Sequence, residues 1–255
     1  MYSPRVFFLP ACLAIVGMTA SCQEAATEPP PVADKGFAVV ELFTSQGCSS
    51  CPPADKLLGK LIADAEAKKR PVFCLAFHVD YWDYLGWKDP NGSKSATQRQ
   101  VAYREAFGAR QVYTPQTIVN GTDEFVGSDE VRAKKSIDAA LTRPAEATIA
   151  LKPQAGTKKG TLDVRYEVTG APKGAVLVVA FVETKISTKV LRGENARRTL
   201  DHFNVVRAFA MADLAKGNKG TTTLDLPAVG AGKVIAFVQV EKGAKIVGAT
   251  AVAAP

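Results

Sequence analysis

The hydrophobic pattern divides the chain into two parts of different character. Between residues 36 and 143, short apolar runs alternate with segments whose apolar residues recur at helical spacing. Strands are predicted at 37–43, 71–77, 117–119 and 124–126, and helices at 52–69, at 95–108 and from Ser128 onward. Asn120 and Gly121 are typical of a hairpin turn between the last two strands. This part is therefore predicted to be an α/β domain.

After Arg143 and Pro144, β-branched runs separated by Gly, Pro and Lys turns replace the helical spacing. Strands are predicted at 147–152, 161–168, 175–183, 205–209, 221–226, 233–241 and 245–252. Such spacing indicates an all-β, sandwich-like domain over residues 144–255. The polar segment that holds Arg197, Arg198 and His202 is interpreted as a solvated loop.

The first 35 residues carry an export pattern. An apolar stretch at 6–18 is too short for a membrane span, and small residues at 19–21 suit a signal peptidase. We therefore predict a signal peptide at 1–22 and a Pro-rich linker at 23–35, and a secreted, periplasmic or envelope-attached protein. Cys22 leaves two interpretations open: a lipidated residue that attaches the protein to a membrane, or an incidental cysteine beside an ordinary cleavage site.

Composition narrows the class of partner. The chain has 255 residues, of which 47% are hydrophobic, and a formal net charge of +7. Its basic residues are scattered, and no dense basic block alternates with aromatic residues, so we predict no binding to nucleic acid. An acidic partner or an anionic envelope surface suits this charge better.

The candidate chemistry lies at Cys48 and Cys51, between the first predicted strand and a helix opened by two prolines. The positive end of a helix dipole favours a thiolate over a thiol, so Cys48 is the predicted nucleophile and Cys51 the resolving cysteine. A structural disulfide and a metal site remain as alternatives, although no second CxxC motif or close His pair completes a zinc site. Cys74 lies in an apolar strand and is predicted to be buried and inert.

Several segments together resemble a family of bacterial secreted, thioredoxin-like proteins known chiefly as a domain of unknown function. They are 40–55 (VELFTSQGCSSCPPAD), 77–83 (FHVDYWD), 113–116 (YTPQ), 124–128 (EFVGS), 193–195 (GEN) and 204–208 (NVVRA). The resemblance implies a thioredoxin-like fold for the α/β N-terminal domain over 36–143, and export to the envelope. The all-β sandwich-like domain that the strand spacing indicates follows it. It supplies no substrate.

Comparison with thioredoxins adds three candidate site residues, and the position of His78 after a strand adds a fourth. Thr114 and Pro115 precede a strand where such folds keep a cis-proline that faces the cysteines and docks substrate. Glu41 falls near the position of a buried acid that accepts a proton, or it is a partly exposed strand residue. His78 directly follows the second strand, where it could assist Cys48, bind copper, or belong to a packed loop.

These observations predict an exported thiol–disulfide oxidoreductase that acts on protein or small-molecule disulfides, with protein thiols or disulfides of the cell envelope as partners. Its only redox group is the Cys48–Cys51 disulfide, and no other cofactor or resident metal is predicted. Two alternatives stay open. One is a copper- or metal-binding envelope chaperone that uses Cys48, Cys51 and His78, and the other is a non-catalytic interaction module.

Overall fold

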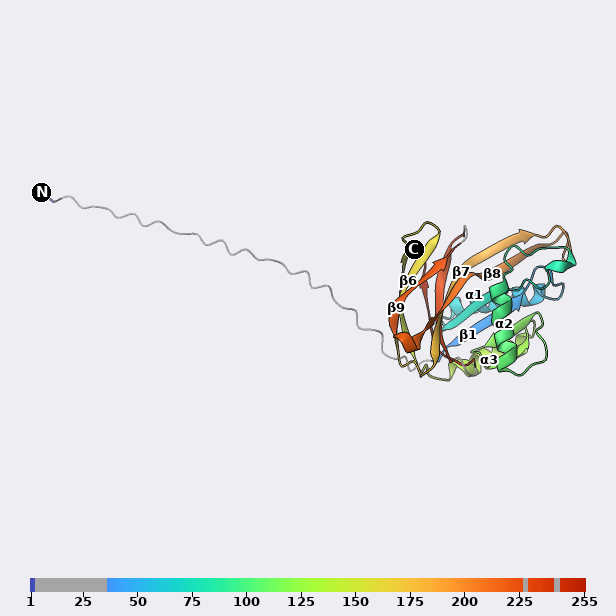
Figure 1. The fold of residues 1–255 in the computed structure, drawn as a ribbon, viewed down its shortest axis with the longest axis horizontal. Helices are drawn as coiled ribbons and strands as arrows, with labels where there is room; N and C mark the ends of the chain where they lie inside the picture. The colour runs from blue at the N-terminus through green and yellow to red at the C-terminus, as the bar shows by residue number, and fades with distance from the viewer. Residues whose placement is uncertain (3–35, 227–228, 241–243) are drawn as a thin grey trace.

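The computed structural model describes residues 1–2, 36–226, 229–240 and 244–255 (Figure 1). Its elements are β1 (Ala38–Thr44), α1 (Pro52–Ala67), β2 (Val72–His78), α2 (Lys94–Ala106), β3 (Gln116–Val119), β4 (Asp123–Val126), α3 (Glu130–Leu141), β5 (Thr148–Ala155), β6 (Thr161–Thr169), β7 (Ala175–Lys189), β8 (Thr199–Asp213), β9 (Lys219–Asp225), β10 (Gly232–Val240) and β11 (Ile246–Ala253). The predicted signal peptide, linker and Cys22 lie outside the described residues, apart from residues 1–2. Within the described ranges, no helix has the length and apolar character needed to cross a membrane.

Strands from both parts of the chain form one mixed sheet of eight strands, in the order β11-β10-β7-β8-β2-β1-β3-β4. The parallel pair β2–β8 joins them through Ala76 and Val205. A second sheet, β5-β6-β9, packs against this one (Figure 1). The predicted fold class, an α/β thioredoxin-like domain followed by a separate β sandwich, is therefore wrong. The described residues form a mostly β structure with three α-helices.

The local elements before residue 143 follow the predicted order with small shifts at their ends. Two prolines open α1, and its apolar stripe packs against the sheet, as the spacing of Leu57, Leu58 and Leu61 predicts. The sequence predicts a helix from Ser128 onward, with Ser128 as its cap. In the structure the cap is Asp129, whose carboxylate accepts a hydrogen bond from the N–H of Arg132.

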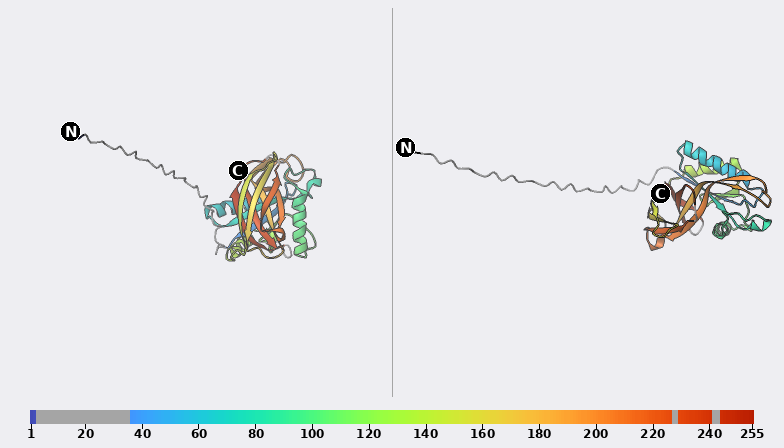
Figure 2. Two further views of the ribbon diagram at one scale, coloured as in Figure 1. Left: turned by 60° about the vertical axis from the view of Figure 1, so that its left-hand side comes forward. Right: turned by 90° about the horizontal axis from the view of Figure 1, so that it is seen from above.

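Both faces of β1 are buried, because successive side chains along a strand point to opposite sides of the sheet. Val40 and Leu42 pack toward α1 and α3. Val39 and Phe43 pack toward α2 and the inner face of β7 and β10. The right-hand view of Figure 2 shows α1 and α2 on opposite sides of the sheet. This alternation decides on which side each polar residue of the site lies.

Candidate functional site

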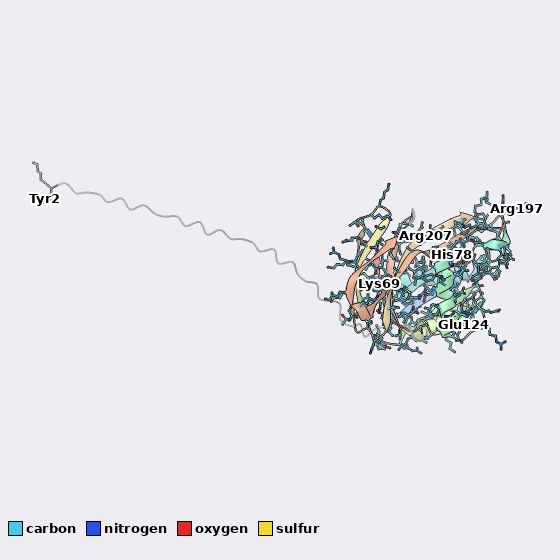
Figure 3. The ribbon with its side chains drawn as sticks, viewed as in Figure 1. Tyr2, Lys69, His78, Glu124, Arg197 and Arg207 are labelled. Atoms are coloured by element: carbon cyan, nitrogen blue, oxygen red, sulfur yellow. A yellow bond between two sulfur atoms is a disulfide. The ribbon has the colours of Figure 1, made fainter. Side chains whose placement is uncertain are left out.

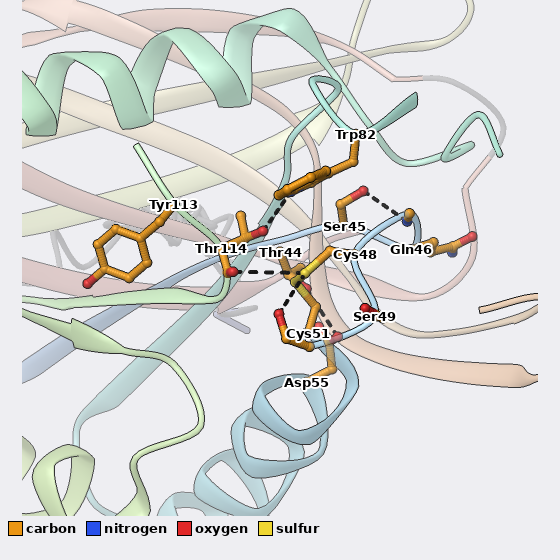
Figure 4. Close-up of a disulfide and its surroundings, with 12 residues drawn as sticks. Thr44, Ser45, Gln46, Cys48, Ser49, Cys51, Asp55, Trp82, Tyr113 and Thr114 are labelled. Atoms are coloured by element: carbon orange, nitrogen blue, oxygen red, sulfur yellow. Dashed lines mark hydrogen bonds between the residues drawn. A yellow bond between two sulfur atoms is a disulfide. The ribbon is translucent and has the colours of Figure 1, made fainter. Parts of the chain in front are cut away.

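Cys48 and Cys51 form a disulfide at the start of α1, with their Cα atoms 5.5 Å apart (Figure 4). Cys51 is the N-cap residue of the helix and is fully buried, whereas the exposed fraction of Cys48 is 3%. Ser49 and Ser50 between them are exposed. The turn therefore presents two small hydroxyl side chains to solvent, and Cys48 is the more accessible of the two sulfurs.

The Thr114–Pro115 peptide bond is cis, as the comparison with thioredoxins implies. The carbonyl oxygen of Thr114 lies 3.9 Å from the Sγ atom of Cys48. The indole N–H of Trp82 donates to the hydroxyl of Thr114 at 2.7 Å, which fixes this segment beside the disulfide (Figure 4). The structure thus brings Thr114, the residue before Pro115, to the more accessible of the two cysteines.

A segment from the second part of the chain holds the CxxC turn in place. The side-chain amide of the buried Asn195 donates to the carbonyls of Gln46 and Cys48, at 2.9 and 3.0 Å. The carboxylate of Glu194 accepts from the N–H of Ser49 at 2.9 Å, and the hydrogen bonds from Ser49 lower the pKa of Glu194. Arg197 and Arg198 are exposed, as a solvated loop requires, and Arg197 lies at the outer edge of the molecule (Figure 3). Asn195 of the same segment is buried against the CxxC turn.

Asp55, His78 and His202 lie buried together, and we call them the His202 cluster. Asp55 is one helical turn after Cys51, while His78 ends β2 and His202 lies in β8. His202 Nδ1 is 3.3 Å from Asp55 Oδ1, and the two imidazole rings meet edge to face with centroids 4.6 Å apart. His202 is fully buried, so its placement in a solvated loop is wrong. These are the only two histidines of the chain.

Neighbouring groups orient two members of the cluster. The hydroxyl of Thr44 donates to Asp55 Oδ2 at 3.1 Å. His78 Nδ1 is hydrogen-bonded to Asp89 Oδ2 at 2.7 Å, and the same carboxylate oxygen accepts from the N–H of Gln46 at 2.8 Å. The cluster is thus tied to the turn that carries the cysteines.

His78 and Asp89 shift each other's pKa values in opposite directions. Burial alone would lower the pKa of His78, but the charge of Asp89 and their hydrogen bond outweigh it and raise this pKa. Burial alone would raise the pKa of Asp89, but His78 and two backbone N–H groups bring it down to about 2.

Four polar atoms of the His202 cluster have no hydrogen-bond partner among the described residues. They are Asp55 Oδ1, His78 Nε2 and both ring nitrogens of His202. Each buried polar atom left unsatisfied costs about 1–3 kcal/mol. Surrounding residues therefore hold the cluster in position, but the atoms that its side chains turn toward one another lack hydrogen-bond partners among the described residues.

Glu41 lies on the opposite face of the sheet, in a second group that we call the Arg99 cluster. Its carboxylate accepts from Arg99 Nε at 2.5 Å, from Arg99 Nη2 at 2.9 Å, and from the hydroxyl of Tyr103. Gln239 completes the cluster by donating to the Tyr103 oxygen at 3.0 Å. The structure does not bring Glu41 to the disulfide. A cavity of about 550 Å³ adjoins Arg99 on this face, and no cysteine lines it.

Comparison with known proteins places the chain in a family. Residues 39–239 match the model of a family described as a protein of unknown function, DUF1223. The chain belongs to the DUF1223 family. This confirms the resemblance to a family of unknown function. No curated protein matches the DUF1223 chain.

Two solved structures resemble the DUF1223 chain over most of its length. The crystal structure of protein AGR_C_4864 from Agrobacterium tumefaciens shares 31% identity, with a TM-score of 0.63, over 88% of this chain and 97% of the other. HBP35 of Porphyromonas gingivalis shares 18% identity, with a TM-score of 0.59, over 86% of this chain and 76% of the other. The second likeness is one of fold alone.

Sequence reasoning missed Asp55, Asp89 and Asn195 and misplaced His202. One signal was available: Asp55 is a carboxylate within the apolar stripe of α1, four residues after Cys51. A polar residue on a buried helix face calls for a partner. Asn195 and His202 of the DUF1223 chain carry no comparable local signal, because their contacts span more than 120 residues of sequence.

Proposed function

We propose that this DUF1223 protein is an exported thiol–disulfide oxidoreductase that acts on protein or small-molecule disulfides of the cell envelope. The observation that carries the proposal is the Cys48–Cys51 disulfide at the start of α1, with the carbonyl of Thr114 beside Cys48. A helix N-terminus stabilises the thiolate that attacks in exchange reactions. Ser49 and Ser50, the exposed residues between the two cysteines, have short side chains, so a partner's backbone could approach Cys48.

The proposed reaction has two exchange steps. In the first, the Cys48 thiolate attacks one sulfur of the partner's disulfide, which forms a mixed disulfide and releases one partner thiolate. In the second, the Cys51 thiolate attacks Cys48 Sγ, which closes the Cys48–Cys51 disulfide and releases the other partner thiolate. Two electrons pass from the protein dithiol to the partner, and the partner's thiolates take up protons from solvent. The reverse sequence oxidises a partner dithiol.

The surroundings of Cys48 indicate how a partner docks. Thr114 and Pro115 form one edge, and Trp82 and Tyr84 stack beside it with ring centroids 6.3 Å apart. The side chain of Tyr84 is largely exposed, so it offers apolar surface to a partner. We propose that an extended segment next to the partner's cysteine lies along this edge. Glu41 takes no part in the proposal.

The test is insulin reduction in the presence of dithiothreitol. Replacing Cys48 with Ser should remove at least 99% of the catalysed rate, and Cys51→Ser should trap mixed disulfides. Cys74→Ser is the matched control, because it removes the buried thiol outside the site and should keep the rate. Unchanged activity in Cys48→Ser would contradict the mechanism.

The reduction potential of the Cys48–Cys51 pair, measured against glutathione buffers, is the second test. A value in the range of known oxidoreductases, about −120 to −270 mV, with rapid exchange would support the proposal and give the direction of electron flow. A pair that resists reduction below about −300 mV would instead be a structural disulfide.

A further inference from the structure

We propose that Asp55, His78 and His202 bind a divalent transition-metal ion, with Zn²⁺ as the ion that fits best. The three side chains come from α1, β2 and β8 and converge in the interior, where their candidate ligand atoms lie within 4.8 Å of one another. Two imidazoles and one carboxylate form a donor set that zinc uses in protein sites, with one position left for a fourth ligand.

The spacing of one donor pair matches that of two ligands on a shared ion. His202 Nδ1 and Asp55 Oδ1 are 3.3 Å apart, yet neither makes a hydrogen bond. Two donors each about 2.0–2.2 Å from a tetrahedral ion lie roughly 3.4 Å from each other. The observed separation of this pair therefore suits two ligands on one ion, and it is also short enough for a direct His–Asp contact when no ion is bound.

Hydrogen bonds from residues outside the cluster occupy one polar atom of His78 and one of Asp55, and leave the other atom of each free to bind an ion. Asp89 holds Nδ1 of His78, so Nε2 is the nitrogen that faces the cluster. The hydroxyl of Thr44 holds Oδ2 of Asp55, so Oδ1 is the oxygen that faces it. A carboxylate behind a ligating imidazole is the usual second contact in zinc sites, because it fixes the orientation of the ring. Binding of the ion would displace any proton from Nε2 of His78.

This site contains no sulfur. Cys48 and Cys51 are bonded to each other, and the nitrogen and oxygen donors suit zinc better than Cu(I), which prefers thiolates. It therefore differs from a chaperone site built from the CxxC pair and His78. The site is nevertheless connected to the CxxC turn, because Asp89 accepts from the N–H of Gln46 and Asp55 N–H donates to the carbonyl of Cys51.

The test uses the oxidised full chain, exported from a bacterial host and purified through a tag without histidine. After removal of metal with a chelator, Zn²⁺ is titrated calorimetrically, and bound zinc is counted after desalting. We expect one zinc per chain. Asp55→Asn and His202→Gln should weaken binding at least 100-fold. Asp64→Asn makes the same change on the same helix, at a side chain 40% exposed, and should not change the affinity.

A second measurement does not depend on whether the variants fold. Because the chain has two histidines, ¹⁵N NMR of labelled imidazoles resolves the two rings of the wild-type protein. Zinc should shift both sets of resonances. The proposal is overturned if the oxidised wild-type protein binds no zinc, if zinc binds only after reduction of the disulfide, or if the His78→Gln/His202→Gln double variant binds it as tightly. These readouts involve no disulfide exchange, so they are independent of the oxidoreductase proposal.

Discussion

Two buried polar clusters lie on opposite faces of the same sheet and differ in how completely they are paired. In the Arg99 cluster, the carboxylate of Glu41 accepts three hydrogen bonds, and Arg99 also contacts the rings of Phe77, Tyr103 and Phe237. In the His202 cluster, four buried atoms have no partner among the described residues. Among the described residues, the first group is fully paired and the second is not.

The difference separates structural roles from functional ones. A buried ion pair with all its hydrogen bonds made is self-sufficient, and it fixes how α2, β1 and β10 pack. Unpaired buried atoms lower stability, so a protein keeps them where something else completes them. The incomplete cluster is also the one beneath the CxxC turn, to which Asp89 connects it. The acid that sequence comparison proposed for catalysis, Glu41, belongs to the structural cluster.

The largest expected effect comes from breaking the complete cluster. Arg99→Met leaves Glu41 buried without its cationic partner, so the free energy of unfolding should fall by about 3–5 kcal/mol. Urea denaturation measures this change. Insulin reduction by the remaining folded protein should stay at the wild-type level, because the disulfide lies on the other face of the sheet. A loss below 1 kcal/mol would mean that the pairing of Glu41 and Arg99 contributes little.

A double variant sharpens this result. The double variant Arg99→Met/Glu41→Leu has neither charge, so no unpaired carboxylate remains buried. It should recover most of the stability that Arg99→Met loses. If the double variant is as unstable as the sum of the two single variants, the loss comes from packing and not from an unpaired charge.

Local features of the sequence were enough to predict where the disulfide lies, but not the two faces of the sheet or its full extent. Adjacent prolines after Cys51 and the apolar spacing of α1 placed the disulfide at a helix start. The side of the sheet on which Glu41 lies was not predictable, because β1 is buried on both faces and its apolar run shows no alternation. The single eight-stranded sheet was missed because β8 pairs with β2 through residues about 130 positions apart.

The next largest effect should come from Asn195, whose side chain holds the CxxC turn in place. Asn195→Ala removes a buried amide that donates to the carbonyls of Gln46 and Cys48, at a local cost of about 1–3 kcal/mol. A loss of 1–2 kcal/mol raises the population of an open turn about 5–30-fold. Reduction of the disulfide by dithiothreitol should therefore accelerate by a similar factor. Arg192→Ala, at an exposed position of the same segment, should leave this rate unchanged.

A smaller effect should come from Cys74, a buried thiol with apolar surroundings on the α1 face of the sheet. Its contribution to the free energy of unfolding should depend on pH. Burial raises the pKa of its thiol to about 12, from a reference of 9.0. The folded protein keeps the thiol neutral while the unfolded chain ionises it, so stability is complete below pH 9 and falls as the pH rises toward 12. The fall should approach about 1.4 kcal/mol per pH unit between pH 9 and pH 12.

Urea denaturation at pH 8, 9 and 10 measures this contribution. The comparison with Cys74→Ala isolates it from that of other groups, since the variant has no thiol to ionise. The stability difference between the wild-type protein and the variant should shrink as the pH rises. A difference that stays constant would show that Cys74 is accessible to solvent or ionises in the folded protein as it does in the unfolded chain.

The smallest effect on stability is expected for a substitution in the His202 cluster. In metal-free protein, His202→Leu replaces a buried ring whose two nitrogens have no described partner, so the free energy of unfolding should change by less than about 1 kcal/mol, or increase. Urea denaturation of the chelator-treated proteins measures this change against the 3–5 kcal/mol expected for Arg99→Met. A loss as large as that of Arg99→Met would show that His202 is already paired, and the distinction between the two clusters would fail. With zinc added, only the wild-type protein should become more stable, because a ligand that binds the folded state alone stabilises that state.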